Sequence, residues 1–192
     1  MLARTHDLAA ITALALVAAT QAVPQMTLST LIAVLLANQI GGIAPDIDQP
    51  TAPFWRNLPV GHVLGRFAGK LLGGHRFLSH SLLGVALFAF LTKLFLEFFQ
   101  PLFPHVDSQL VWYAFIIGIL SHLVMDTITK EGVPWLLPIP IKFGVPPLRS
   151  LRITTGSWRE VWLVLPLLLV IDLWLLNMHY TSILSYLHHL QR

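Results

Sequence analysis

The chain has 192 residues, of which 55% are hydrophobic and 11% are charged, with a mean hydropathy of +0.71. Soluble domains carry about 25% charged residues, so the composition excludes an ordinary soluble domain and predicts an integral membrane protein. The absence of cysteine excludes thiolate metal sites, disulfides and a cysteine nucleophile. The net charge of +3 is typical of a membrane protein that contacts anionic lipid. No nucleic-acid-binding motif is present, so we expect no nucleic-acid partner.

Five apolar runs predict an all-α, multi-span bundle of about five transmembrane helices. The runs cover residues 8–23, 26–44, 81–99, 110–125 and 161–178. We expect one integral membrane domain over residues 1–192. The first run also has features of a signal peptide, but Asp7 and a single preceding arginine favour a retained helix. The tail at 180–190 could continue the last helix or lie at the membrane interface.

The distribution of basic residues predicts an orientation. Five spans place the N-terminus and the loops 46–80 and 126–160 on one side of the membrane. That side holds ten of the twelve lysine and arginine residues, and the opposite side holds only Arg192. Since basic loops stay in the cytoplasm, we expect a cytoplasmic N-terminus and an external C-terminus.

Four polar clusters stand at the ends of the apolar runs, all on the predicted cytoplasmic face. His122 and Asp126 are four residues apart, so they share one helix face and can reach one divalent cation. The alternative is a buried hydrogen bond that locks two helices. Asp46 and Asp48 repel each other unless a cation or proton lies between them, although they could also cap a turn. The other clusters contain His6, and His75 and His80 around Arg76.

These clusters predict one composite metal site. Its candidate ligands are four imidazoles and three carboxylates: His6, Asp46, Asp48, His75, His80, His122 and Asp126. Mixed nitrogen and oxygen ligands suit zinc foremost, with manganese or iron as alternatives, better than calcium. The set exceeds the four ligands of a closed structural zinc site. It fits two metals, or one metal with carboxylates that orient the histidines.

Three motifs resemble those of a known family. They are APDIDQP over residues 44–50, GHRFLSHSL over residues 74–82, and Gly118 to Pro134 with the pattern GxxSHxxxDxxTxxGVP. With His6, they resemble the YdjM/YbcI-type, LexA-regulated inner-membrane proteins, described as membrane-bound metal-dependent hydrolases. Gln49 and Phe77 stand where the family has His and Gly. The resemblance implies a bacterial inner (plasma) membrane location and hydrolysis.

We therefore expect hydrolysis of a phosphoester, with a phospholipid or other lipid-linked phosphate as the substrate at the membrane face. Asp48, Asp126 or Glu160 would act as general base or orient the water, and Arg76 would hold the substrate anion. One alternative is a non-enzymatic protein in which metal ties the helix ends together. A transporter is a weaker alternative, because the candidate ligands lie at one face rather than at the bilayer midplane. The oligomeric state is left open.

Overall fold

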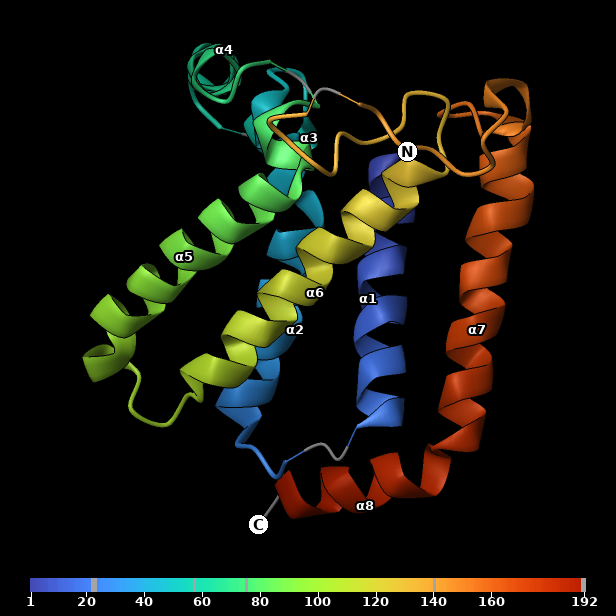
Figure 1. The fold of residues 1–192 in the computed structure, drawn as a ribbon. Helices are drawn as coiled ribbons and strands as arrows, with labels where there is room; N and C mark the ends of the chain where they lie inside the picture. Colours follow the sequence, from blue (N-terminus) through green and yellow to red (C-terminus); the bar gives the residue numbers. More distant parts are fainter. Residues whose placement is uncertain (22–23, 57, 75, 140, 191–192) are drawn as a thin grey trace.

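The computed structural model describes residues 1–192 except 22–23, 57, 75, 140 and 191–192. Five long helices form the bundle in Figure 1: α1 (Ala3–Thr20), α2 (Leu28–Ile43), α5 (Leu82–Phe99), α6 (Ser108–Thr127) and α7 (Leu165–Met178). Within the described residues, four segments are long and apolar enough to cross a membrane: Leu28–Asp48, Leu82–Leu102, Ser108–Thr127 and Glu160–Met178. This confirms the predicted helical membrane fold. Helix α1 runs beside the others, but Arg4, His6 and Asp7 make its beginning polar.

The two ends of the bundle differ in what they carry. The N-terminus, the short helices α3 (Pro53–Arg56) and α4 (Gly61–Leu71) and the loop 128–159 gather at one end, which we call the polar end (Figure 1). Two short turns also belong to it, η1 (Ala44–Asp48) after α2 and η2 (Leu78–His80) before α5. The turn η3 (Gln100–Leu102) leads from α5 toward α6, and η4 (Arg149–Leu151) lies in the loop 128–159. The π-helical turn η5 (Glu160–Val164) leads into α7.

Helix α1 begins earlier than predicted. We expected His6 before the first helix, but α1 starts at Ala3 and His6 is buried within it. The N–H of Leu2 donates to the Glu160 carboxylate at 2.6 Å. A negative charge at a helix N-terminus is stabilising, and here it comes from a residue far away in the chain. The neighbouring sequence therefore does not reveal where this helix starts.

The C-terminal tail forms a separate helix, α8 (Tyr180–Leu190), which does not extend α7. Figure 1 shows it running across the end of the bundle opposite the polar end, whereas α7 runs along the bundle. The Tyr186 hydroxyl accepts a hydrogen bond from the backbone N–H of Met26 at 3.1 Å. This geometry agrees with the interfacial alternative for the tail.

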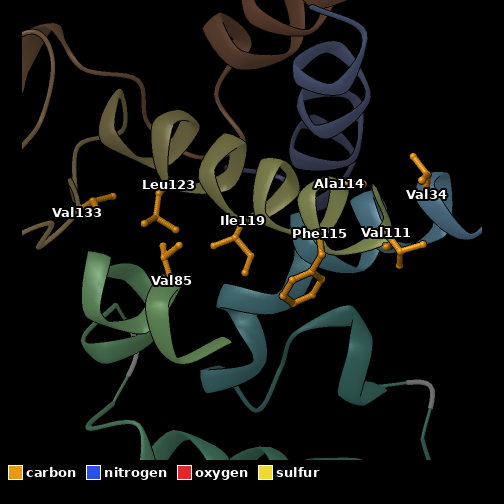
Figure 2. Packing of buried hydrophobic residues seen from close by; sticks show 9 residues of the cluster. Val34, Val85, Val111, Ala114, Phe115, Ile119, Leu123 and Val133 are labelled. Atoms are coloured by element: carbon orange, nitrogen blue, oxygen red, sulfur yellow. The ribbon is translucent and has the colours of Figure 1, made fainter. Parts of the chain in front are cut away.

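Close packing of α2 against α6 sets the centre of the bundle. A Cβ atom on Gly41 would collide with the carbonyl oxygen of Phe115, and one on Gly118 would collide with that of Asn38. Small residues thus allow the two backbones to touch, as in many membrane helix pairs. Around this contact lies an apolar cluster on α6 that includes Leu123, which faces Val85 of α5 in Figure 2.

The proline-rich segment that follows α6 is held in place by hydrogen bonds on both sides of residue 140. Val133 and Phe143 exchange backbone hydrogen bonds of 2.8 and 2.9 Å, and the N–H of Lys130 donates to Ile153 at 2.9 Å. The Arg152 guanidinium donates to the carbonyl oxygens of Pro146 and Pro147 at 2.7 and 3.0 Å. The loop therefore forms a fixed cover over the polar end.

Candidate metal centre

His122 presents one ring nitrogen that is suited to a cation. Its Nδ1 lies 2.7 Å from the carbonyl oxygen of Gly42, so Nδ1 carries the proton and Nε2 keeps its lone pair. This Nε2 is buried and has no hydrogen-bond partner within the described residues. It faces Asp46 Oδ1 at 3.7 Å and Asp126 Oδ2 at 3.8 Å, which is too far for hydrogen bonds. A buried acceptor aimed at two carboxylates is the arrangement of a metal ligand.

His80 faces the same two carboxylates. Its Nε2 lies 3.7 Å from Asp46 Oδ1 and 3.5 Å from Asp126 Oδ2. The four nitrogen–oxygen separations between these two imidazoles and two carboxylates therefore span 3.5–3.8 Å. A tetrahedron with metal–ligand bonds of about 2.1 Å has edges of about 3.4 Å. A zinc-sized cation fits among Asp46, His80 and His122 with small adjustments, and Asp126 Oδ2 lies close to both imidazoles.

His6 belongs to a second, overlapping group. Its ring stacks on that of His122 with centroids 3.7 Å apart, and its Nε2 lies 3.4 Å from Asp126 Oδ1. Ligand atoms of His6, His122 and Asp126 all lie within 4.8 Å of one another, as do those of Asp46, His80 and His122. Because His122 offers only Nε2 to both groups, it can serve one cation at a time. The geometry favours one cation over two.

Asp48 lies behind His80. It is fully buried, and its Oδ2 accepts hydrogen bonds from the Ser79 hydroxyl and, at 3.0 Å, from the N–H of Arg76. The same oxygen is 3.5 Å from His80 Nδ1. A carboxylate in this position orients the imidazole and makes it a better ligand. This is the arrangement of one metal with an orienting carboxylate, while direct ligation by Asp48 stays a prediction.

The same contacts shift the pKa of His80. Burial lowers the pKa of His80, but the hydrogen bonds and negative charges of Asp126 and Asp48 outweigh burial and raise it above its usual value. Protons therefore compete with a cation for His80.

The guanidinium of Arg76 is already paired with other side chains of the protein. Its guanidinium lies 2.7 Å from Asp126 Oδ2 and donates to the Thr129 hydroxyl at 3.1 Å. Its backbone is in the left-handed region, with φ of 58°. Phe77, which replaces the family's glycine, has a φ of −112° and so avoids that region. The guanidinium fixes the orientation of Asp126, and its predicted role in holding a substrate anion stays a prediction.

Glu160 organises the start of α1. It is fully buried, and its two oxygens accept the N–H groups of Leu2 at 2.6 Å and Gly156 at 2.7 Å. The amino group of Met1 lies 2.7 Å from Asp126 Oδ1. These contacts position His6, and a general-base role for Glu160 stays a prediction. His75, the remaining predicted ligand, lies outside the described residues.

Two cavities meet at Asp46. One, of about 430 Å³, is bordered by Arg76, Thr129, Lys130 and Lys142 among others. The second, of about 400 Å³, is bordered by His6 and by mainly apolar residues that include Phe54 and Leu58. Asp46 borders both. The candidate metal centre is thus accessible from outside the protein.

Comparison with known proteins agrees with the fold and the motifs. A model of the YdjM inner membrane protein family matches residues 1–185. The chain belongs to this family. It is 31% identical over 109 residues to inner membrane protein YdjM of Escherichia coli (strain K12), covering 54% of this chain and 48% of that protein. It is 27% identical over 121 residues to the uncharacterized protein YvsG of Bacillus subtilis (strain 168), covering 63% of this chain and 64% of that protein. No solved structure matches.

In this member of the YdjM family, the structure adds residues that sequence reasoning did not place at the site. Ser79 lies inside the GHRFLSHSL motif, and its hydroxyl donates to Asp48, whereas Thr129, which the sequence already suggested as a supporting or loop-ordering residue, accepts a hydrogen bond from Arg76. Gly42 contributes only its carbonyl oxygen, which no side-chain pattern reveals. Lys142 reaches the cavity through the fold of the loop 128–159. Lys130 directly follows Thr129, so the motif itself could have pointed to it.

Proposed function

We propose that this YdjM-family protein is a metal-dependent hydrolase that cleaves a phosphoester, with a phospholipid or other lipid-linked phosphate as substrate. The observation that carries the proposal is the cavity of about 430 Å³ that reaches Asp46, whose carboxylate converges with His80 and His122. A structural zinc site closes its coordination sphere, whereas a catalytic site keeps one position open. This difference favours catalysis over the alternative of a metal that only ties helices together.

The residues of the centre have distinct roles in this proposal. Asp46, His80 and His122 hold the cation, with zinc foremost and manganese or iron as alternatives, while Asp126 lies beside the two imidazoles and one position stays open toward the cavity. When bound, the cation supplies Lewis acidity and lowers the pKa of a coordinated water. Asp48 orients His80, and Arg76 orients Asp126. Asp46 is 25% exposed and borders the cavity, so a cation that it holds would face the cavity.

The proposed reaction takes place at the cytoplasmic face of the bacterial inner membrane. The predicted excess of lysine and arginine falls on the polar end, which supports this orientation. The chain has no cysteine, so single cysteines can report the side directly. Lys130→Cys should react with a membrane-impermeant maleimide in inside-out vesicles and stay unlabelled in intact spheroplasts. His105→Cys, between α5 and α6, should show the reverse, and labelling of Lys130→Cys in spheroplasts would reject the orientation.

Metal analysis of the purified protein tests the first step. After incubation with zinc and removal of excess, we expect about one metal per chain, and less than half of that in His122→Ala. His105→Ala is the matched control, because His105 lies between α5 and α6, far from the polar end. Hydrolysis of a lipid phosphate should follow metal content across these proteins. Wild-type protein that binds no metal, or a His122→Ala variant that binds as much as wild type, would refute the proposal.

A further inference from the structure

The two cavities beside Asp46 differ in their chemistry. In the first, Lys130 and Lys142 are exposed, and neither forms an ion pair within the described residues. The arginines nearby are already engaged: Arg76 with Asp126, and Arg149 with Glu131 at 3.6 Å. Glu131 also borders this cavity but pairs with Arg149, so among the described residues of its wall the two lysines are the cations that remain for an anionic ligand.

The second cavity is bordered mainly by apolar side chains. Ile43, Ala52, Phe54 and Leu58 line it, with Asp7 as an additional charged residue on its wall. Phe54 and Leu58 are 42% and 43% exposed, so they present apolar surface next to the metal centre. Aliphatic and aromatic surface of this kind binds a hydrocarbon chain and offers little to a free sugar or inorganic ion.

Helix α4 packs on α3, which carries Phe54, and on the turn η1, which carries Asp46. It is seen nearly end-on in Figure 1, whereas α1 and α7 run up the picture, so α4 lies across the end of the bundle. Its glycines contact Trp55 and the backbone of Asp48, while Phe67 and Leu71 are exposed on its surface. An amphipathic helix with this arrangement is suited to the membrane interface.

We propose that the site binds an amphiphilic phosphate. Its anionic group lies between Asp46 and the Lys130–Lys142 side, and its hydrocarbon chain lies along Phe54 and Leu58. Asp46 borders both cavities, and in this proposal the ligand extends past Asp46 from one cavity into the other. This inference rests on the proposed function, because it uses the same metal centre, and it specifies which residues recognise each part of the substrate.

Binding of two phosphonates to zinc-loaded protein in lipid nanodiscs tests the inference. Methylphosphonate and hexylphosphonate carry the same anion and differ by five methylenes, and their phosphorus–carbon bond resists hydrolysis. We expect hexylphosphonate to bind at least about tenfold more tightly, since each buried methylene contributes favourably. Empty nanodiscs correct for partition of the longer ligand into lipid.

Two double variants separate the two halves of the site. Lys130→Ala with Lys142→Ala should weaken both phosphonates to a similar extent, by about tenfold or more, because each lysine provides a charge-assisted contact. Phe54→Ala with Leu58→Ala should weaken hexylphosphonate alone and bring it close to methylphosphonate. Val63→Ala is the control, since Val63 is an exposed apolar residue of α4 that borders neither cavity.

The outcomes distinguish this inference from the proposed function. Equal affinity of wild-type protein for both phosphonates, or no effect of the lysine variants, would overturn the inference while metal content stays normal. Metal content measured in the same samples reports on the metal centre itself. A sample without metal would refute the proposed function, and phosphonate binding in that sample would still test the two cavities.

Discussion

The two halves of α6 differ in the side chains that they bury. The half that includes Val111, Phe115 and Ile119 packs apolar side chains against α2 and α5 (Figure 2). The half that ends at Thr127 buries His122 and Asp126 in the same helix. Burial stabilises the first half through packing, whereas a buried polar or charged group is costly unless it is paired. One helix thus stabilises the fold through its apolar half and positions candidate metal ligands through its polar half.

Removal of Asp126 should have the largest effect on the polar half. Asp126→Ala leaves the buried guanidinium of Arg76 without its carboxylate, which costs about 3–5 kcal/mol of stability. The variant should also lose the metal. Reversible unfolding in mixed micelles and metal analysis measure the two effects.

A second substitution tests whether the unpaired guanidinium of Arg76 causes the loss of stability. Arg76→Met added to Asp126→Ala should restore most of the stability and none of the metal binding. If Asp126→Ala alone unfolds like wild type, the Arg76–Asp126 pair does not stabilise this end of the bundle.

Gly118→Leu should disturb both halves of α6, because Gly118 lies between them. The new side chain would collide with the backbone of α2, and overpacking of this kind costs about 1–3 kcal/mol. Separation of α2 from α6 would also break the contact between His122 and Gly42, so metal affinity should fall together with stability. Val124→Leu is the control, since Val124 is 55% exposed on the same helix. Reduced stability with unchanged metal affinity would show that the halves are independent.

Asp48→Asn should weaken metal binding while the fold stays intact. The amide keeps the shape of the side chain but loses the negative charge that orients His80, and such changes reduce metal affinity about 10–100-fold. Competition with a chromogenic chelator measures this affinity. Gln49→Ala at the neighbouring position should leave it unchanged, as expected if residue 49 is not a ligand. A complete loss of metal in Asp48→Asn would instead indicate that Asp48 binds the cation directly.

Val124→Ala should have the smallest effect. Val124 is exposed on the outside of α6, so the change should alter stability by less than about 0.5 kcal/mol and leave metal affinity as in wild type. Thermal unfolding and chelator competition on this variant set the baseline for the other three. A larger loss would mean that a partner helix covers this face, and crosslinking of a cysteine at position 124 would identify it.

Much of this architecture could be predicted from the sequence because its signals are local. Long apolar runs predict membrane helices wherever they occur, and the structure places α2, α5 and α6 within a few residues of the predicted spans. The spacing of His122 and Asp126 places both side chains on one helix face before any fold is known. The distribution of apolar runs also predicts that the polar clusters gather at one end, and the described members His6, Asp46, His80 and Asp126 do so.

The tertiary structure decided what each polar residue does there. Glu160 caps a helix 158 positions earlier in the chain, the carbonyl of Gly42 selects the proton position of His122, and Asp48 stands behind His80. These relations depend on backbones brought together by packing, such as the glycine contact between α2 and α6. By itself, the sequence therefore determined the membrane fold and the candidate ligands. Only the three-dimensional packing decided how they are oriented and which side of Asp46 is basic or apolar, because distances between remote segments are not encoded in local patterns.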